Sequence, residues 1–344
     1  MVEMICKELA LRKTYLPPNS AIKTIYFGGG TPSLLDPLHL EKILNQIYTC
    51  YDVQLEEMTL EGNPDDLNLE KLSMYKTMGV DRLSIGIQSF DPEVLKFYNR
   101  AHNATESLNA IKIAQKAGFE KLSIDLIYGY PALTHQIWQK DLEIAFDQDP
   151  GHISSYSLTV EPKTVLGNWT KKGKFKEASE EFAAAQFEIL MTEMELHGYI
   201  QYEISNFARP GQFAVHNTNY WKGIPYLGIG PSAHSFDGSG RGANVSNNAL
   251  YMKALSSGSI PMEVDEESIS DVINAYILTS LRTIWGTDLD HIQTLSGIDL
   301  IQEKKTLFDQ LVTEKMLEKK NTKLILTNKG KLLADSIAAA LFID

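Results

Sequence analysis

The sequence predicts an α/β fold whose first half is a parallel sheet covered by helices. Two observations support this prediction. Apolar, β-rich segments recur along the first 160 residues, and segments with helix start and stop signals lie between them. The five predicted strands are Ile22–Phe27, Glu57–Glu61, Arg82–Ile87, Lys121–Ile127 and His152–Leu158. Strands this apolar are buried on both faces, which is typical of a parallel sheet, either open or closed into a barrel.

The helices between these strands have recognisable ends. Asp36 and Asp91 each precede a proline, an arrangement that favours an N-cap followed by the first helical turn. Gly79 and Gly118 stand where helix C-terminal caps belong. These signals alternate with the strands, so the first half is predicted to consist of repeated βα units.

The chain opens with a helical pattern, because Met4, Ile5 and Leu9 recur at helical spacing. A βα fold seldom begins with a helix that no strand precedes. We therefore expect the first strand of the fold to belong before Met1 and to be absent from this chain.

The pattern changes after about residue 160 and divides the chain into three predicted domains: residues 1–160, 161–260 and 261–344. The middle domain has a long helix, Ser179–His197, followed by a region rich in Gly, Asn and Tyr. The last domain is mainly helical and ends with a hairpin, Met316–Lys319 and Lys323–Thr327, before a terminal helix. This order resembles a winged helix.

Composition and charge argue against several classes of function. Acidic residues outnumber basic ones by 44 to 32, for a net charge of −12, which disfavours a nucleic-acid partner. No apolar run has the length of a transmembrane segment, and no signal pattern opens the chain. The two cysteines, Cys6 and Cys50, lie in helical patterns and are expected to be small buried hydrophobes. A cytoplasmic location is therefore expected.

A glycine turn follows the first predicted strand: Gly28, Gly29 and Gly30, then Thr31. Glycines let the backbone approach a ligand closely, and their carbonyls could accept hydrogen bonds from an ammonium group. The alternative is a tight turn between strand and helix with no ligand. A phosphate-binding P-loop is excluded because the Gly-Lys-Ser/Thr ending is missing.

Polar residues stand at or near the ends of three successive predicted strands: Glu61, Gln88 and Asp125. Parallel α/β folds bind ligands at the carboxyl ends of their strands. A single such residue could be a helix cap, but three from neighbouring strands predict one small-molecule site. Their chemistry suits ribose hydroxyls and an amino group.

A histidine in the aromatic region is a candidate metal or haem ligand. His216 is followed by Asn217 and, after two residues, by Tyr220 and Trp221. A neutral imidazole can ligate iron, although most histidines in such a setting only hydrogen-bond within a packed loop. His234, in a Gly-Pro-rich loop, is the second candidate.

Three segments together resemble one family: Tyr26–Ser33, Arg82–Phe90 and Ser123–Gly129. Through them the chain resembles, essentially from end to end, the radical S-adenosylmethionine (SAM) family that contains oxygen-independent coproporphyrinogen III oxidases and haem chaperones. The resemblance implies a partial (βα)6-type barrel in which the glycine turn meets the amino group of SAM and Gln88 and Asp125 contact SAM. It also implies that Arg100, in Asn99–His102, lies near the SAM carboxylate.

Within that family, Tyr202–Ala208 and His216–Trp221 resemble the haem-chaperone branch. This likeness implies that His216 ligates haem iron beside Tyr220, and that the chain delivers haem to respiratory acceptor proteins. The alternative is an oxygen-independent coproporphyrinogen III oxidase. The family binds a [4Fe–4S] cluster through a Cys-x-x-x-Cys-x-x-Cys loop, and nothing like it occurs in this chain. As given, the chain is therefore expected not to cleave SAM.

Overall fold

The computed structural model describes residues 1–343, which form two compact units. Unit 1 comprises residues 1–30, 35–58 and those from 215 onward; unit 2 comprises residues 31–34 and 59–214. Strand β2 (Val53–Gly62) begins in unit 1 and ends in unit 2. The domain boundaries expected at residues 160 and 260 remain predictions.

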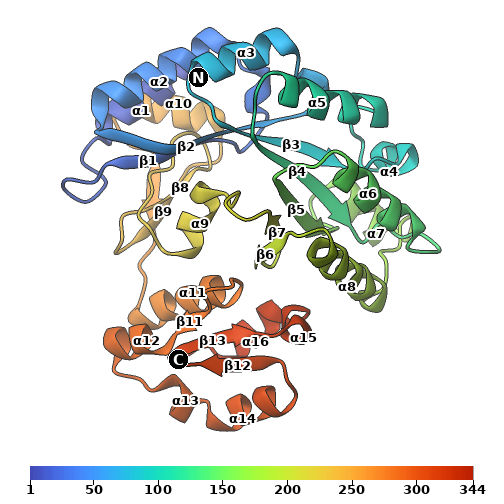
Figure 1. The fold of residues 1–344 in the computed structure, drawn as a ribbon. Helices are drawn as coiled ribbons and strands as arrows, with labels where there is room; N and C mark the ends of the chain where they lie inside the picture. Colours follow the sequence, from blue (N-terminus) through green and yellow to red (C-terminus); the bar gives the residue numbers. More distant parts are fainter. Residues whose placement is uncertain (344) are drawn as a thin grey trace. The chain divides into compact units, whose positions relative to one another are not determined.

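All five predicted strands of the first half are present, and the α/β fold class is confirmed (Figure 1). The strand order is β1-β2-β3-β4-β5-β7-β6, so the first five strands are neighbours in the order of the sequence. The pairs β2–β3, β3–β4 and β4–β5 are parallel, whereas β7 pairs antiparallel with both β5 and β6. The other strands span Ile22–Phe27 (β1), Arg82–Gln88 (β3), Lys121–Tyr128 (β4), His152–Ser157 (β5), Ile200–Glu203 (β6) and Asn206–Ala208 (β7).

The helix signals predicted in unit 2 lie at helix ends. Asp91 accepts hydrogen bonds from the backbone N–H groups of Glu93 and Val94, and Ser179 caps the long helix. Gly79 and Gly118 take positive φ values of 95° and 83° after their helices, a conformation that glycine adopts at little cost. The helices are α3 (Leu69–Thr77), α4 (Pro92–Phe97), α5 (Ala104–Lys116), α6 (Gln136–Asp147), α7 (Val165–Lys171) and α8 (Glu180–Leu196), with short 3-10 turns at Pro32–Leu34 and Pro64–Asp66.

The first part of unit 1 is a helix pair followed by a small sheet. Helices α1 (Val2–Leu11) and α2 (Pro37–Cys50) pack together through Cys6, Leu9 and Ile43. Asp36 caps α2, as predicted. The later elements are α9 (Val215–Trp221), α10 (Asn248–Ser256) and an antiparallel sheet of order β10-β9-β8, with strands Met262–Val264, Arg241–Asn244 and His234–Phe236.

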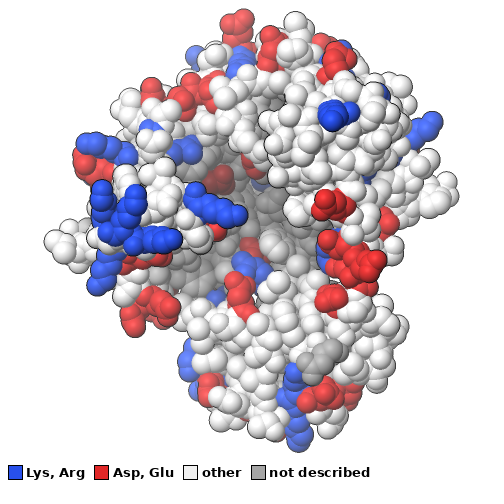
Figure 2. Space-filling view, turned by 180° about the vertical axis from the view of Figure 1, so that it is seen from behind, with Lys and Arg blue, Asp and Glu red and all other residues white. Residues whose placement is uncertain are grey.

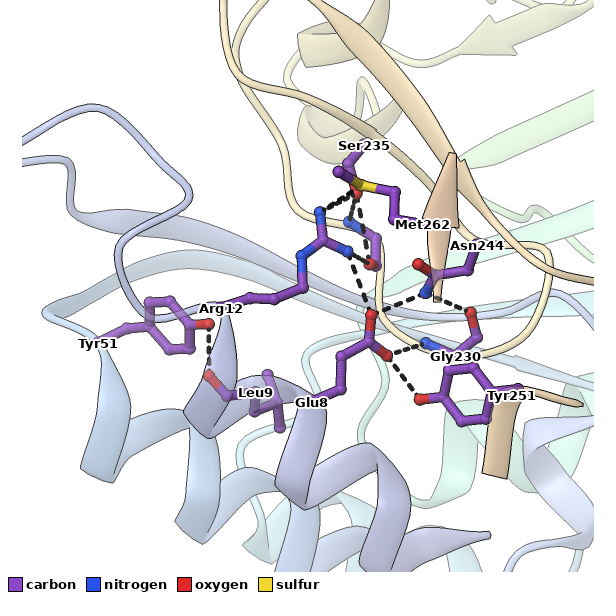
Figure 3. Close-up of polar contacts among 10 residues, drawn as sticks. Glu8, Leu9, Arg12, Tyr51, Gly230, Ser235, Asn244, Tyr251 and Met262 are labelled. Atoms are coloured by element: carbon purple, nitrogen blue, oxygen red, sulfur yellow. Dashed lines mark hydrogen bonds and ion pairs between the residues drawn. The ribbon is translucent and has the colours of Figure 1, made fainter. Parts of the chain in front are cut away.

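A buried polar network ties α1 to the segment that carries this sheet (Figure 3). The fully buried Glu8 carboxylate pairs with Arg12, one turn further along α1. It also accepts hydrogen bonds from Gly230 N at 2.9 Å, Asn244 Nδ2 at 2.7 Å and the Tyr251 hydroxyl at 2.5 Å. Each buried charge thereby has partners, which offsets the cost of removing it from water.

The end of the chain contains the predicted hairpin between helices. Strands β12 (Leu317–Lys320) and β13 (Lys323–Leu326) pair antiparallel, and the short β11 (Thr287–Asp288) completes a sheet of order β11-β13-β12. Ile273 and Ile277 of α11 are fully buried. The helices are α11 (Ile269–Leu281), α12 (Leu289–Ser296), α13 (Leu300–Glu303), α14 (Lys305–Thr313), α15 (Asn328–Lys331) and α16 (Ala334–Ala340).

The surface carries charges of both signs. Figure 2 shows acidic and basic side chains interspersed over the face in view, with one gathering of basic side chains on the side where α7 lies. Exposed lysines around that helix are Lys163, Lys171, Lys172, Lys174 and Lys176. None of the helices within residues 1–343 is both long enough and apolar enough to span a bilayer.

Candidate functional site

The register of the parallel strands in unit 2 places a row of polar side chains on one face of the sheet. Glu61 pairs with Ser84 on the next strand, and Asp125 pairs with Ser154. Ser84 in turn pairs with Ser123, which lies two residues before Asp125, and residues two apart on a strand share a face. Glu61, Ser84, Asp125 and Ser154 therefore face the same side.

Asp125 is the electrostatic centre of this row. Burial raises the pKa of its carboxyl to about 7, and the nearby negative charge of Glu61 acts in the same direction. Ser84 Oγ donates a hydrogen bond to Asp125 Oδ1 at 3.3 Å, and Ser154 also bonds the carboxylate. Near neutral pH both protonation states of Asp125 are present, so this carboxyl can donate to or accept from a ligand hydroxyl.

A second polar group lies at the end of β3, around Gly86. Arg100 Nη2 donates to Asn63 Oδ1 at 2.7 Å and to the Gly86 carbonyl at 3.1 Å. A Cβ at Gly86 would stand 2.8 Å from Gln88 Nε2 and 3.4 Å from Arg100 Nη2, so both side chains lie directly over this glycine. The absence of a side chain at Gly86 thus makes the space in which Gln88 and Arg100 sit together.

The residues of unit 2 fit the groups of SAM. Arg100 Nε is buried and has no hydrogen-bond partner among the described residues, so the guanidinium has a donor available for a carboxylate. Loss of solvation lowers the pKa of Arg100 from its ordinary value, which a bound anion would counteract. Glu61 and Asp125 supply acceptors for ribose hydroxyls or an ammonium group. Four predicted residues, Glu61, Gln88, Arg100 and Asp125, thus occur in one unit.

The glycine turn follows β1, as predicted. Gly29 has a φ of 73°, which favours glycine, and no heavy atom lies within 4 Å of a Cβ built on Gly29 or Gly30. These glycines therefore face open space and are not required by close packing. Gly28 to Gly30 belong to unit 1 and Thr31 to unit 2. Their contact with a ligand remains a prediction.

His216 lies near the start of α9 in unit 1 and is held from several directions. Thr24 Oγ1 is 2.8 Å from His216 Nδ1, and the Tyr26 ring stacks on the imidazole with ring centroids 4.8 Å apart. The buried carboxylate of Glu57 accepts hydrogen bonds from the backbone N–H groups of Val215 at 3.1 Å and His216 at 2.9 Å. Glu57 thereby satisfies two donors that a helix N-terminus leaves unpaired.

The imidazole of His216 suits iron ligation. Burial lowers its pKa to about 4, so the ring is neutral at physiological pH. Nδ1 is engaged with Thr24, whereas no hydrogen bond of Nε2 occurs among the described residues. A neutral imidazole anchored through one nitrogen with the other free is the usual arrangement of a protein metal ligand.

The two other residues predicted for this region differ in their surroundings. The Tyr220 ring contacts His216 edge-on with centroids 5.1 Å apart, and burial raises the pKa of its hydroxyl to about 12. His234 begins β8 and is exposed. His216 is thus half-buried among aromatic rings, whereas His234 is exposed, and the role of either as a haem ligand remains a prediction.

The cysteines do not fit an iron–sulfur cluster. Cys6 is buried between α1 and α2, where burial raises the pKa of its thiol, and it is the small buried hydrophobe that the sequence predicts. Cys50 is half-buried and accepts a hydrogen bond from Gln46. Within residues 1–343 there is no group of three His, Cys, Asp or Glu side chains placed to hold a metal ion.

Sequence reasoning missed several residues of these sites, among them Asn63, Glu57 and Thr24. Asn63 directly follows β2 and carries the same strand-end signal as Gln88, so it could have been found. Glu57 directly precedes the apolar residue Met58 in β2, and an acidic residue next to a buried segment is a signal that a buried partner exists. Nothing in the sequence indicates that Thr24 contacts His216.

Comparison with known proteins identifies the family of the chain. The radical SAM superfamily profile matches residues 5–145. A Bacillus subtilis protein named "Heme chaperone HemW" is 34% identical over 93% of this chain and 85% of its own length. The chain belongs to the HemW family. A protein of the same name from Lactococcus lactis is 31% identical over 94% of this chain and 85% of its own length.

A solved structure also shows the radical SAM fold. Escherichia coli coproporphyrinogen III oxidase (HemN) covers 99% of this chain and 82% of its own length, with a TM-score of 0.82 and 21% identity. At that identity the likeness shows the fold alone. Between the two functions considered from the sequence, the comparisons favour HemW, because both family members described above carry that name.

Proposed function

We propose that this chain binds haem through His216 and delivers it to acceptor proteins. The observation that supports this most directly is the neutral, Thr24-anchored imidazole of His216, whose Nε2 has no partner among the described residues and lies among aromatic rings. When bound, haem would supply iron as the group that the imidazole ligates. Tyr220 would flank the porphyrin.

Haem transfer tests this proposal. The chain is loaded with haem, freed of excess haem and mixed with a haem-free acceptor haem protein, and the Soret band of the acceptor is followed. We expect the acceptor spectrum to appear with the parent chain and with His234→Ala, but not with His216→Ala. No transfer from the parent chain, or equal transfer from the His216→Ala variant, would contradict the proposal.

We propose further that unit 2 binds SAM. Arg100 would hold its carboxylate, Gln88 and Asp125 its ribose, and Glu61 a hydroxyl or the amino group; the glycine turn, Gly28 to Thr31, is assigned to SAM by family resemblance only. The available Arg100 Nε and the Asp125 carboxyl, whose pKa burial raises to about 7, support this assignment. Saturation-transfer NMR detects weak SAM binding directly. Arg100→Ala should abolish the SAM signal, whereas an unchanged signal would remove Arg100 from the site.

The acceptors that we propose are respiratory haem proteins, reached in the cytoplasm. The [4Fe–4S] cluster of the radical SAM pattern would need a Cys-x-x-x-Cys-x-x-Cys loop, which this sequence does not contain. Crosslinking of the haem-loaded chain in cell extract, followed by mass spectrometry, should recover haem proteins. Recovery of the same proteins with the His216→Ala variant would speak against haem-dependent contact.

A further inference from the structure

The turn that carries Gln88 is in an unfavourable backbone conformation. Gln88 has a φ of 69°, in the left-handed region, which is unfavourable for a residue that carries a side chain. The register between β3 and β4 also shifts between Ile85 and Gln88. Immediately afterwards, Ser89 N donates to Ile87 O at 2.9 Å, which closes a tight turn. Such a conformation persists only where its surroundings hold it.

Asp141, on α6, holds this turn from outside the sheet. Its carboxylate is 3% exposed and meets the turn with both oxygens. Oδ2 accepts from Ser89 Oγ at 2.6 Å, and Oδ1 accepts from Phe90 N at 2.7 Å. Ser89 Oγ accepts in turn from Asp91 N at 3.0 Å, which extends the network to the N-cap of α4.

A second side chain contacts the residue before Gln88. His102 Nε2 lies 3.1 Å from the Ile87 carbonyl oxygen. The residues on either side of Gln88 are therefore fixed, one by His102 and the other by Asp141. Gln88 itself projects over Gly86 toward Arg100. Its direction is set by the backbone that these two side chains constrain.

We infer that Asp141 is a positioning residue for the SAM site: by holding Ser89 and Phe90 it fixes the Gln88 side chain beside Arg100. This inference rests on the proposed SAM site of unit 2. Asp141 does not itself belong to the polar row of Glu61 and Asp125. Its influence on SAM is expected to pass through Gln88 alone.

The substitution that tests this is Asp141→Asn. Asparagine has the same shape and keeps an oxygen for the Phe90 N–H, but its NH2 group cannot accept from Ser89 Oγ and can only donate to it. The charge-assisted hydrogen bond that holds Ser89 is therefore replaced by a weaker neutral one of reversed direction. Since a hydrogen bond contributes about 1 kcal/mol, we expect SAM to bind roughly five- to tenfold more weakly. Glu143→Gln, on an exposed position of the same helix, is the matched control and should bind SAM as the parent does.

A double-mutant cycle with Gln88→Ala separates positioning from general destabilisation. If Asp141 acts through Gln88, the Gln88→Ala variant and the double variant should bind SAM equally weakly. Asp141→Asn should leave the haem titration unchanged, both in the parent chain and in the Gln88→Ala variant.

Two results would overturn the inference while the SAM site stands. The first is that Asp141→Asn binds SAM as tightly as the parent chain does. The second is that Asp141→Asn weakens SAM binding as much in the Gln88→Ala variant as in the parent chain. Absence of SAM binding by the parent chain would instead refute the proposed SAM site, and the role of Asp141 would fall with it.

Discussion

Replacing Glu57 with alanine should both destabilise the chain and weaken haem binding. The carboxylate is buried at 1% exposure and accepts two hydrogen bonds at the start of α9, from Val215 N and His216 N. Hydrogen bonds to charged groups contribute about 1.5 to 3 kcal/mol each, and both N–H groups belong to half-buried residues, so we take the lower end. The expected loss of unfolding free energy is about 3 kcal/mol.

The glutamine variant should lose less, about 1 to 2 kcal/mol, because one acceptor oxygen remains. Urea unfolding followed by circular dichroism measures the free energies, and haem titration of the same proteins measures affinity. Glu56→Ala is the matched control: Glu56 is the exposed neighbour on the same strand, and its loss should cost under about 0.5 kcal/mol. If Glu57→Ala unfolds like the control and binds haem like the parent, the reasoning about α9 is refuted.

Three further outcomes are expected. Gly86→Ala should weaken SAM binding and leave stability nearly unchanged, because its Cβ meets the movable end of Gln88; an unchanged SAM titration would contradict this. Glu8→Ala should lower the unfolding free energy by about 3 to 5 kcal/mol in urea, since it leaves Arg12 buried without its ion partner, and a loss under about 1 kcal/mol would disprove this. The pKa of the His216 imidazole is about 4 in the folded chain and about 6.5 in the unfolded chain. The contribution of this ring to the unfolding free energy should therefore be complete above pH 6.5 and be lost as the pH falls toward 4. The His216→Gln variant should lose correspondingly less stability over that range; equal losses would reject the lowered pKa.

Most of the fold was predictable because its signals are local. The strand segments are short apolar runs, and the caps at Asp36, Asp91 and Ser179 are set by residues within one helical turn. The alignment of Glu61 with Asp125 was also predictable. It follows from the rule that parallel strands end at one edge of a sheet, and local patterning is enough to apply that rule.

The parts that could not be predicted depend on contacts across long stretches of sequence. Glu57 caps α9 from 159 positions before His216, and Thr24 meets the same histidine across 192 positions. Asp141 holds Ser89 across 52 positions. In each case the residue type permits many roles, and only the packing of distant elements selects one. A lone sequence therefore indicates that such a residue needs a partner, without indicating which partner.

The most direct test of the haem assignment is a titration with haem, followed by absorption spectroscopy. The parent chain, His216→Ala and His234→Ala are compared at equal concentration. We predict a saturable Soret shift near one equivalent for the parent and for His234→Ala, and its loss in His216→Ala. Absence of saturable binding by the parent, or an unchanged titration of His216→Ala, would contradict the account.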